Sequence, residues 1–71
     1  MEFKRLRDMR TDHDLKQVEV AKILHIAQTV YSRYERGVRT IPVELLIELS
    51  KLYDVSTDYL LGLTDNPKRN K

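Results

Sequence analysis

The chain has no cysteine, and only two glycines and two prolines occur among its 71 residues. The absence of cysteine excludes disulfide scaffolds, thiolate zinc sites and cysteine nucleophiles. The scarcity of glycine and proline excludes glycine-rich phosphate loops, collagen-like repeats and low-complexity segments. The length leaves room for one small domain and none for a substrate cavity, so we expect no enzyme activity, no metal and no cofactor.

Long hydrophobic runs are also absent. No apolar segment approaches the roughly 20 residues that span a bilayer, and the charged start of the chain is not followed by a hydrophobic signal segment. We therefore expect a cytoplasmic protein that does not bind membranes. Residues 1–63 are expected to form the domain, and residues 64–71 a flexible polar tail.

Neither sign of charge dominates the composition, because 13 Lys and Arg residues against 11 Asp and Glu residues give a net charge of +2. The charges are nevertheless divided along the chain. Residues 1–15 carry four of each sign, residues 16–39 have five basic and two acidic side chains, and residues 40–63 have one basic and four acidic ones. A basic middle segment is compatible with a nucleic-acid partner and also with an ordinary solvated surface.

Apolar residues recur three and four positions apart along the chain, and no segment alternates as a strand does. This spacing predicts an all-α domain of five short helices. They are expected at Glu2 to about Asp12, from near Gln17, from Ile26-Ala27, through Leu46, Leu49 and Tyr53, and over Thr57–Leu61.

Single residues predict where these helices begin and end. Gly37 is suited to the left-handed position after the third helix, and Pro42 to a place near the first position of the fourth. Asp54 is expected to end the fourth helix in a left-handed conformation, Ser56 to cap the last helix, and Gly62 to stop it.

The second and third predicted helices, within Gln17–Arg36, have the length and spacing of a helix-turn-helix. An ordinary helical hairpin would show equally good apolar spacing. It would not explain the outward face of the third helix, where side chains that can read DNA base edges gather. These candidate base readers are Gln28, Thr29, Ser32 and Arg33.

The chain resembles the phage repressor and Cro-type helix-turn-helix DNA-binding family over residues 2–63. The motifs that carry the resemblance are Leu6-Arg7 with Arg10, Gln17-x-x-Val20-Ala21, Ile26-Ala27-Gln28, Ser32-Arg33-Tyr34-Glu35-Arg36-Gly37 and Val55-Ser56-x-Asp58-Tyr59-Leu60-Leu61. The resemblance implies a compact five-helix domain of the lambda-repressor type, which binds double-stranded DNA as a homodimer. It also implies a transcriptional regulator that acts as a repressor.

The resemblance assigns further roles to individual residues. It implies that Gln17 contacts a phosphate and also braces Gln28, and that Arg10 and Glu35 form a buried ion pair; the alternative is two independent surface charges. The expected phosphate contacts are Lys16, Gln17, Arg36, Arg39 and Thr40. The expected dimer interface contains Ile41, Leu45, Thr57 and Leu60.

The chain departs from the family pattern at four positions. Lys16 and Ala27 stand where the family has Ser or Thr, so the second and third helices are expected to lack side-chain N-caps. His25 replaces the usual turn glycine, so it must either tolerate or avoid a positive φ, a conformation that His adopts more readily than bulky residues do. Tyr31 occupies an aliphatic core position, so its hydroxyl must find water or a partner.

Two alternatives remain open at this point. A metal role for His25 is disfavoured because His13 is its only possible histidine partner. A protein-interaction or antitoxin-like module with weak DNA binding is the main competing function. Ile41, Leu45 and Ile47 favour it, since they are apolar beyond what the buried stripe of their helix needs, although homodimerisation explains them equally well.

Overall fold

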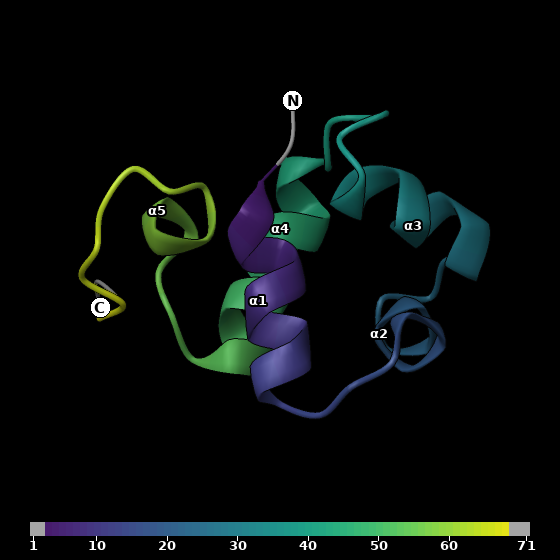
Figure 1. Ribbon diagram of the computed structural model, residues 1–71, viewed down its shortest axis with the longest axis horizontal. Helices are drawn as coiled ribbons and strands as arrows, with labels where there is room; N and C mark the ends of the chain where they lie inside the picture. Colours follow the sequence, from purple (N-terminus) through teal and green to yellow (C-terminus); the bar gives the residue numbers. More distant parts are fainter. Residues whose placement is uncertain (1–2, 69–71) are drawn as a thin grey trace.

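The computed structural model describes residues 3–68, and within this range the chain is entirely helical apart from its connections (Figure 1). The predicted all-α fold with five short helices is confirmed. The helices are α1 (Lys4–Asp12), α2 (Gln17–Ile23), α3 (Gln28–Glu35), α4 (Val43–Tyr53) and α5 (Thr57–Leu60).

In Figure 1, α1 and α4 lie in the middle of the molecule, α2 and α3 lie on one side, and α5 lies on the other. The central helix α1 contacts both α3 and α5, while α2 packs against α3 and α4 packs against α5. The molecule measures 30 × 22 × 21 Å. Because α1 touches both sides, it fixes the position of the α2–α3 pair relative to the rest of the domain.

Every helix contributes one of the five largest fully buried side chains of the core. These five residues are Leu6, Val20, Tyr31, Leu49 and Leu60. Burying a side chain of this size stabilises the fold by about 1.5–3 kcal/mol relative to leaving it in water. The shared core explains how helices of four to eleven residues, too short to be stable alone, persist in this domain.

The predicted helix starts are correct to within two residues. The predicted first residue of α1, Glu2, lies outside the described residues, and the third helix begins at Gln28 with Ala27 as its N-cap. Pro42 lies near the first position of α4 as predicted: its ψ of 150° is extended, so it is the N-cap directly before Val43. As predicted, the Ser56 side chain caps α5 by accepting a hydrogen bond from the Tyr59 backbone N–H.

The ends of α2 and α4 use left-handed backbone conformations at non-glycine residues. His25 has a φ of 59° and Asp54 a φ of 54°. The left-handed conformation was predicted for Asp54, and His25 tolerates the positive φ and does not avoid it. Asp14, with a φ of 55°, turns the chain between α1 and α2 in the same way and was not predicted. Gly37 and Gly62 follow α3 and α5 with positive φ, although α5 ends at Leu60, one residue before the predicted end.

The described part of the C-terminal segment contacts the domain body. Arg5 donates hydrogen bonds to the carbonyls of Tyr59 and Thr64 and forms an ion pair with Asp65. The Ser56 backbone N–H donates to the Pro67 carbonyl over 3.0 Å. Flexibility of the tail stays a prediction. None of the helices described is long and apolar enough to span a lipid bilayer.

Candidate nucleic-acid interface

The four predicted base readers lie together on the outward face of α3. Gln28, Thr29 and Arg33 are exposed, and Ser32 is half-buried. With Gln17 and Arg36, the four residues line one shallow hollow on the surface. The structure thus brings these side chains together, while their role in reading bases stays a prediction.

The opposite face of α3 holds the helix in place. Tyr31, Tyr34 and Glu35 are buried there. The tight turn before α3 depends on Ala21, which is 1% exposed, and whose carbonyl accepts a hydrogen bond from the Ile26 backbone N–H over 3.0 Å. The left-handed His25 completes this turn. A small side chain in α2 and a tight turn together place α3 across α2 with its polar face outward.

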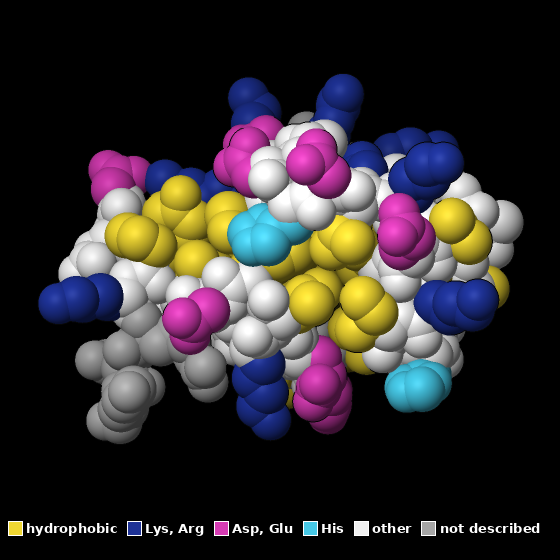
Figure 2. Space-filling view, turned by 90° about the horizontal axis from the view of Figure 1, so that it is seen from below, with side chains coloured by type: hydrophobic (Ala, Val, Ile, Leu, Met, Phe, Trp, Pro, Cys, Tyr) yellow, Lys and Arg dark blue, Asp and Glu magenta, His cyan; other side chains and the backbone are white. Residues whose placement is uncertain are grey.

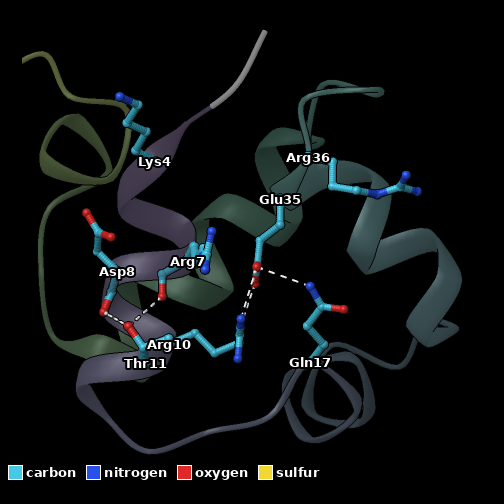
Figure 3. Close-up of a pocket in the computed structure, with 8 residues that line it drawn as sticks. All are labelled: Lys4, Arg7, Asp8, Arg10, Thr11, Gln17, Glu35 and Arg36. Atoms are coloured by element: carbon cyan, nitrogen blue, oxygen red, sulfur yellow. Dashed lines mark hydrogen bonds and ion pairs between the residues drawn. The ribbon is translucent and has the colours of Figure 1, made fainter.

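The predicted ion pair between Arg10 and Glu35 is present and bidentate (Figure 3). Arg10 Nε donates to Glu35 Oε2 over 2.6 Å, and Arg10 Nη2 donates to Glu35 Oε1 over 3.2 Å. The third donor, Nη1, bonds the Leu15 carbonyl over 2.9 Å. The Arg10 side chain is 14% exposed and the Glu35 side chain 4% exposed. The pair therefore joins α1, the α1–α2 connection and the end of α3.

The structure gives Gln17 a hydrogen-bond partner other than Gln28, and the brace between Gln17 and Gln28 stays a prediction. The Gln17 side-chain amide donates to Glu35 Oε1 over 3.2 Å, and no hydrogen bond links it to Gln28 among the described residues. The reason is that the Glu35 carboxylate, a charged acceptor, lies within reach of the first turn of α2. Gln17 consequently connects α2 to the ion pair and still lines the hollow beside α3.

The ion pair shifts the pKa of both partners toward their charged forms. Burial acts to raise the pKa of the Glu35 carboxyl, but the hydrogen bond from Arg10, the proximity of the Tyr31 hydroxyl and the hydrogen bond from Gln17 together lower it below its ordinary value. The hydrogen bond to Glu35 raises the pKa of the Arg10 guanidinium against the opposing effect of burial. Both groups are therefore charged at neutral pH.

Two tyrosine hydroxyls are buried near this pair. Neither the Tyr31 nor the Tyr53 hydroxyl makes a hydrogen bond of ordinary geometry to the described residues, although the Tyr31 hydroxyl lies close enough to Glu35 to interact with its charge. Burial, reinforced by the Glu35 charge, raises the pKa of Tyr31 well above its ordinary value and that of Tyr53 to about 12. Both phenols stay neutral across the physiological range.

The predicted phosphate contacts are spread around the α2–α3 pair. Arg36 lies at the end of α3 and is exposed, and it lines the same hollow as the base readers. Lys16 at the start of α2, and Arg39 and Thr40 in the loop after α3, are also exposed. The Arg39 backbone N–H bonds the Arg33 carbonyl over 3.3 Å, so this loop folds back over the end of α3.

Half of the predicted dimer residues are unavailable at the surface. Ile41 is 6% exposed and Leu60 is 0% exposed, because both pack in the protomer core. Leu45 and Thr57 are half-buried. Apolar side chains do reach the surface elsewhere, as Figure 2 shows for the side of the molecule seen from below. A dimer contact through α4 thus has to use Leu45 with exposed neighbours such as Ile47, and not Ile41 or Leu60.

The histidines lie at separate places on one face of the molecule (Figure 2). His13 lies against the Tyr53 ring, with 5.0 Å between ring centroids. His25 is exposed in the turn before α3. The part of the chain described by the structure contains no group of three or more His, Cys, Asp or Glu side chains that could hold a metal ion.

Sequence reasoning missed a second hollow, between α1 and the α2–α3 pair (Figure 3). Lys4 and Arg7 of α1 line it. Their spacing could have indicated this basic surface, since residues three positions apart lie on one face of a helix. Counting charge over residues 1–15 concealed it, because that segment carries equal numbers of basic and acidic residues.

A helix-turn-helix family model matches residues 6–60, nearly the whole of the folded region. The chain belongs to the helix-turn-helix family. Its relatives include the "HTH-type transcriptional regulator ImmR" of Bacillus subtilis, 43% identical over 96% of this chain and 54% of that protein. They also include the "Cryptic phage CTXphi transcriptional repressor RstR" of Vibrio cholerae, 35% identical over 72% of this chain and 46% of that protein. The resemblance to the phage repressor and Cro-type family is confirmed.

Another helix-turn-helix relative is the "Uncharacterized HTH-type transcriptional regulator YobD" of Bacillus subtilis, 43% identical over 94% of this chain and 60% of that protein. The chain spans about half the length of the curated relatives it matches. No solved structure matches the chain significantly.

Proposed function

We propose that the chain is the DNA-binding domain of a transcriptional repressor and that α3 lies in the major groove of double-stranded DNA. The division of α3 into two faces carries the proposal. Its buried face anchors the helix through Tyr31, Tyr34 and Glu35, and its polar face gathers Gln28 and Arg33 with their neighbours around one hollow. Membership of the helix-turn-helix family supports the same function.

The chemistry of the polar face fits direct reading of bases. A glutamine side chain forms two hydrogen bonds with adenine, and an arginine forms two with guanine, whereas Thr and Ser are more permissive. Gln28 and Arg33 are exposed and free to extend toward a base edge. Phosphates are then contacted by the exposed cations around these two residues and by two neutral side chains. The cations are Lys16, Arg36 and Arg39, and the neutral residues are Gln17 and Thr40. These contacts set the register and orientation of the protein on the duplex.

The proposed function is tested by selecting, from a random-sequence pool, the duplexes that the protein binds. The affinity of the protein for the enriched sequence is then compared with its affinity for a scrambled duplex. The expected result is a sequence preference that Arg33→Ala removes. Lys51→Gln is the matched control, because it deletes one exposed positive charge on α4, away from both hollows. A pool that yields no enriched sequence would reject the proposal.

A homodimer belongs to this proposal, because helix-turn-helix proteins of this geometry read two half-sites about one helical turn apart. An interface with two-fold symmetry uses the same patch on both copies. Leu45 and Thr57, which are half-buried, and the exposed Ile47 on α4 supply such a patch. The relatives ImmR, a transcriptional regulator, and RstR, a transcriptional repressor, are each longer than the region that this chain matches.

A second candidate function is that of an antitoxin-like module that binds a partner protein. One relative, "Antitoxin PezA" of Streptococcus pneumoniae, is 34% identical over 83% of this chain and 37% of that protein. Repressor function is favoured over this alternative because α3 presents base-reading side chains. Binding to random duplexes at two salt concentrations separates the two, since only a DNA-binding domain shows strong, salt-sensitive affinity.

A further inference from the structure

The second hollow lies between α1 and the α2–α3 pair and has a volume of about 740 Å³. Figure 3 shows its side chains coming from α1, from the start of α2 and from the end of α3. The residues that line it are Lys4, Arg7, Asp8, Arg10, Thr11, Gln17, Glu35 and Arg36.

The charge of this hollow is positive. The buried ion pair at its base is internally neutral. Three exposed cations remain, Lys4, Arg7 and Arg36, against the single carboxylate of Asp8. None of the three cations forms an ion pair within residues 3–68. They are therefore available to an anionic partner.

This surface arises because some basic side chains of α1 are held in ion pairs and others are not. Arg5 is engaged by Asp65 and by carbonyls of the C-terminal segment, and Arg10 is engaged by Glu35. Lys4, just before Arg5, and Arg7, between Arg5 and Arg10, form no ion pair with any residue in 3–68. Because they stand three residues apart on one helix, their Cβ atoms lie about 5–6 Å from each other on the same face.

The two hollows adjoin each other. Gln17 and Arg36 line both of them, so a partner seated on α3 reaches the α1 surface without a break. DNA is such a partner, because its charged strands border the groove that a recognition helix enters. Each strand of duplex DNA carries one phosphate charge per roughly 3.4 Å of helix axis. A strand that follows the two hollows therefore meets several of these cations in succession.

We propose that Lys4 and Arg7 form a second phosphate-contacting surface, which binds the DNA strand that borders the groove occupied by α3. The inference rests on the proposed function, since it takes duplex DNA to be the partner. It extends the contact beyond the helix-turn-helix to the first helix of the domain. Asp8 limits the affinity of this surface because its carboxylate repels the same strand.

The test measures the salt dependence of binding to a mixed-sequence duplex of 20 base pairs by fluorescence anisotropy between 50 and 200 mM salt. The double variant Lys4→Gln/Arg7→Gln is expected to reduce the slope of log K against log salt by about 1.8, because each phosphate contact contributes about 0.9. Asp8→Asn is expected to act in the opposite direction and tighten binding severalfold. All three side chains are exposed, so the variants keep the fold, as thermal melting would verify.

The matched control is Lys51→Gln/Lys68→Gln, which removes the same charge from residues that line neither hollow and leaves the slope unchanged. A wild-type slope in the Lys4→Gln/Arg7→Gln variant would overturn the inference and leave the proposed function standing. Absence of duplex binding by the wild type would overturn both. Poly-glutamate serves as a second probe: loss of its binding in the variant, with duplex binding intact, would assign the surface to an acidic protein segment instead.

Discussion

Arg10 in α1 and Glu35 at the end of α3 form a bidentate ion pair, 25 positions apart in the sequence and almost closed to solvent. Gln17 adds a bond from α2 to the same carboxylate. Three helices thus meet at one charged group. Because α3 carries the proposed base readers, the position of the reading face depends on a contact that is made on the opposite side of the helix.

Removing one partner of this pair is expected to cost more than removing both. Arg10→Met leaves the Glu35 carboxylate buried without its cation, which typically costs about 3–5 kcal/mol of unfolding free energy. In Arg10→Met/Glu35→Leu no charge remains uncompensated, so the loss is expected to be much smaller. Urea denaturation of the wild type and both variants measures the difference. Equal losses in the single and double variants would contradict a buried pair with strong coupling.

The same pair predicts a pH dependence of stability. Because the pKa of Glu35 is lower in the folded protein than its ordinary value of 4.5, the unfolded chain binds more protons in that range, and stability rises with pH there. The contribution is complete above about pH 4.5 and is lost as the pH falls through the folded pKa. Unfolding free energy measured from pH 7 to pH 3 is expected to fall less in Arg10→Met/Glu35→Gln than in the wild type.

The missing N-caps of α2 and α3 offer a way to stabilise the domain. Neither Lys16 nor Ala27 provides a side-chain cap, although both have the extended backbone of an N-cap. Lys16→Ser is expected to complete a capping box, because Glu19 already accepts the Lys16 backbone N–H over 2.9 Å. Each serine is worth about 1 kcal/mol, or about 4–8 °C in Tm for a domain of this size.

Differential scanning calorimetry measures these gains. Lys16→Ala and Ala27→Val are the comparison variants, since neither adds a hydroxyl and neither Ala nor Val is a favourable N-cap residue. Lys16→Ser is also expected to weaken DNA binding if the lysine contacts a phosphate, and Lys16→Ala should weaken it equally. A Tm that stays level or falls in both serine variants would contradict the assignment of these two N-caps.

The spacing of apolar residues and the residue types at turns made most of the fold predictable from the sequence. The burial of residues at the helix ends was not predictable in this way. Asp54 was expected in a left-handed conformation at the end of its helix and adopts it, while His25, for which either outcome was open, adopts one as well. Ile41 and Leu60 were predicted at a surface, but both are buried. Their burial depends on how α4 and α5 meet the core, which no local sequence pattern specifies. Gln17 was paired with Gln28 from the family resemblance, which does not reveal that the Gln17 amide donates a hydrogen bond to Glu35.

The base readers are expected to affect specificity more than general affinity. Gln28→Ala and Arg33→Ala each remove a side chain able to form two hydrogen bonds with one base, worth about 1–3 kcal/mol against the wrong base. Contacts with phosphates elsewhere are retained, so binding to scrambled DNA changes little. Affinities for a selected duplex and a scrambled one measure the ratio. Equal losses on both would remove these residues from the reading role.

The interface through α4 is expected to be weak in solution and to tighten on DNA that carries two half-sites about 10 base pairs apart. Leu45 is half-buried, so Leu45→Glu is expected to leave the protomer folded while it places a charge opposite its own copy across the two-fold axis. Sedimentation should then show a monomer, and footprinting should show the two half-sites filling independently. Leu60→Glu is the contrasting variant, because it buries a charge in the protomer core and is expected to unfold the domain. If the wild type is already a strict monomer and fills each half-site independently, the dimer proposal is wrong and the partner-binding function gains support.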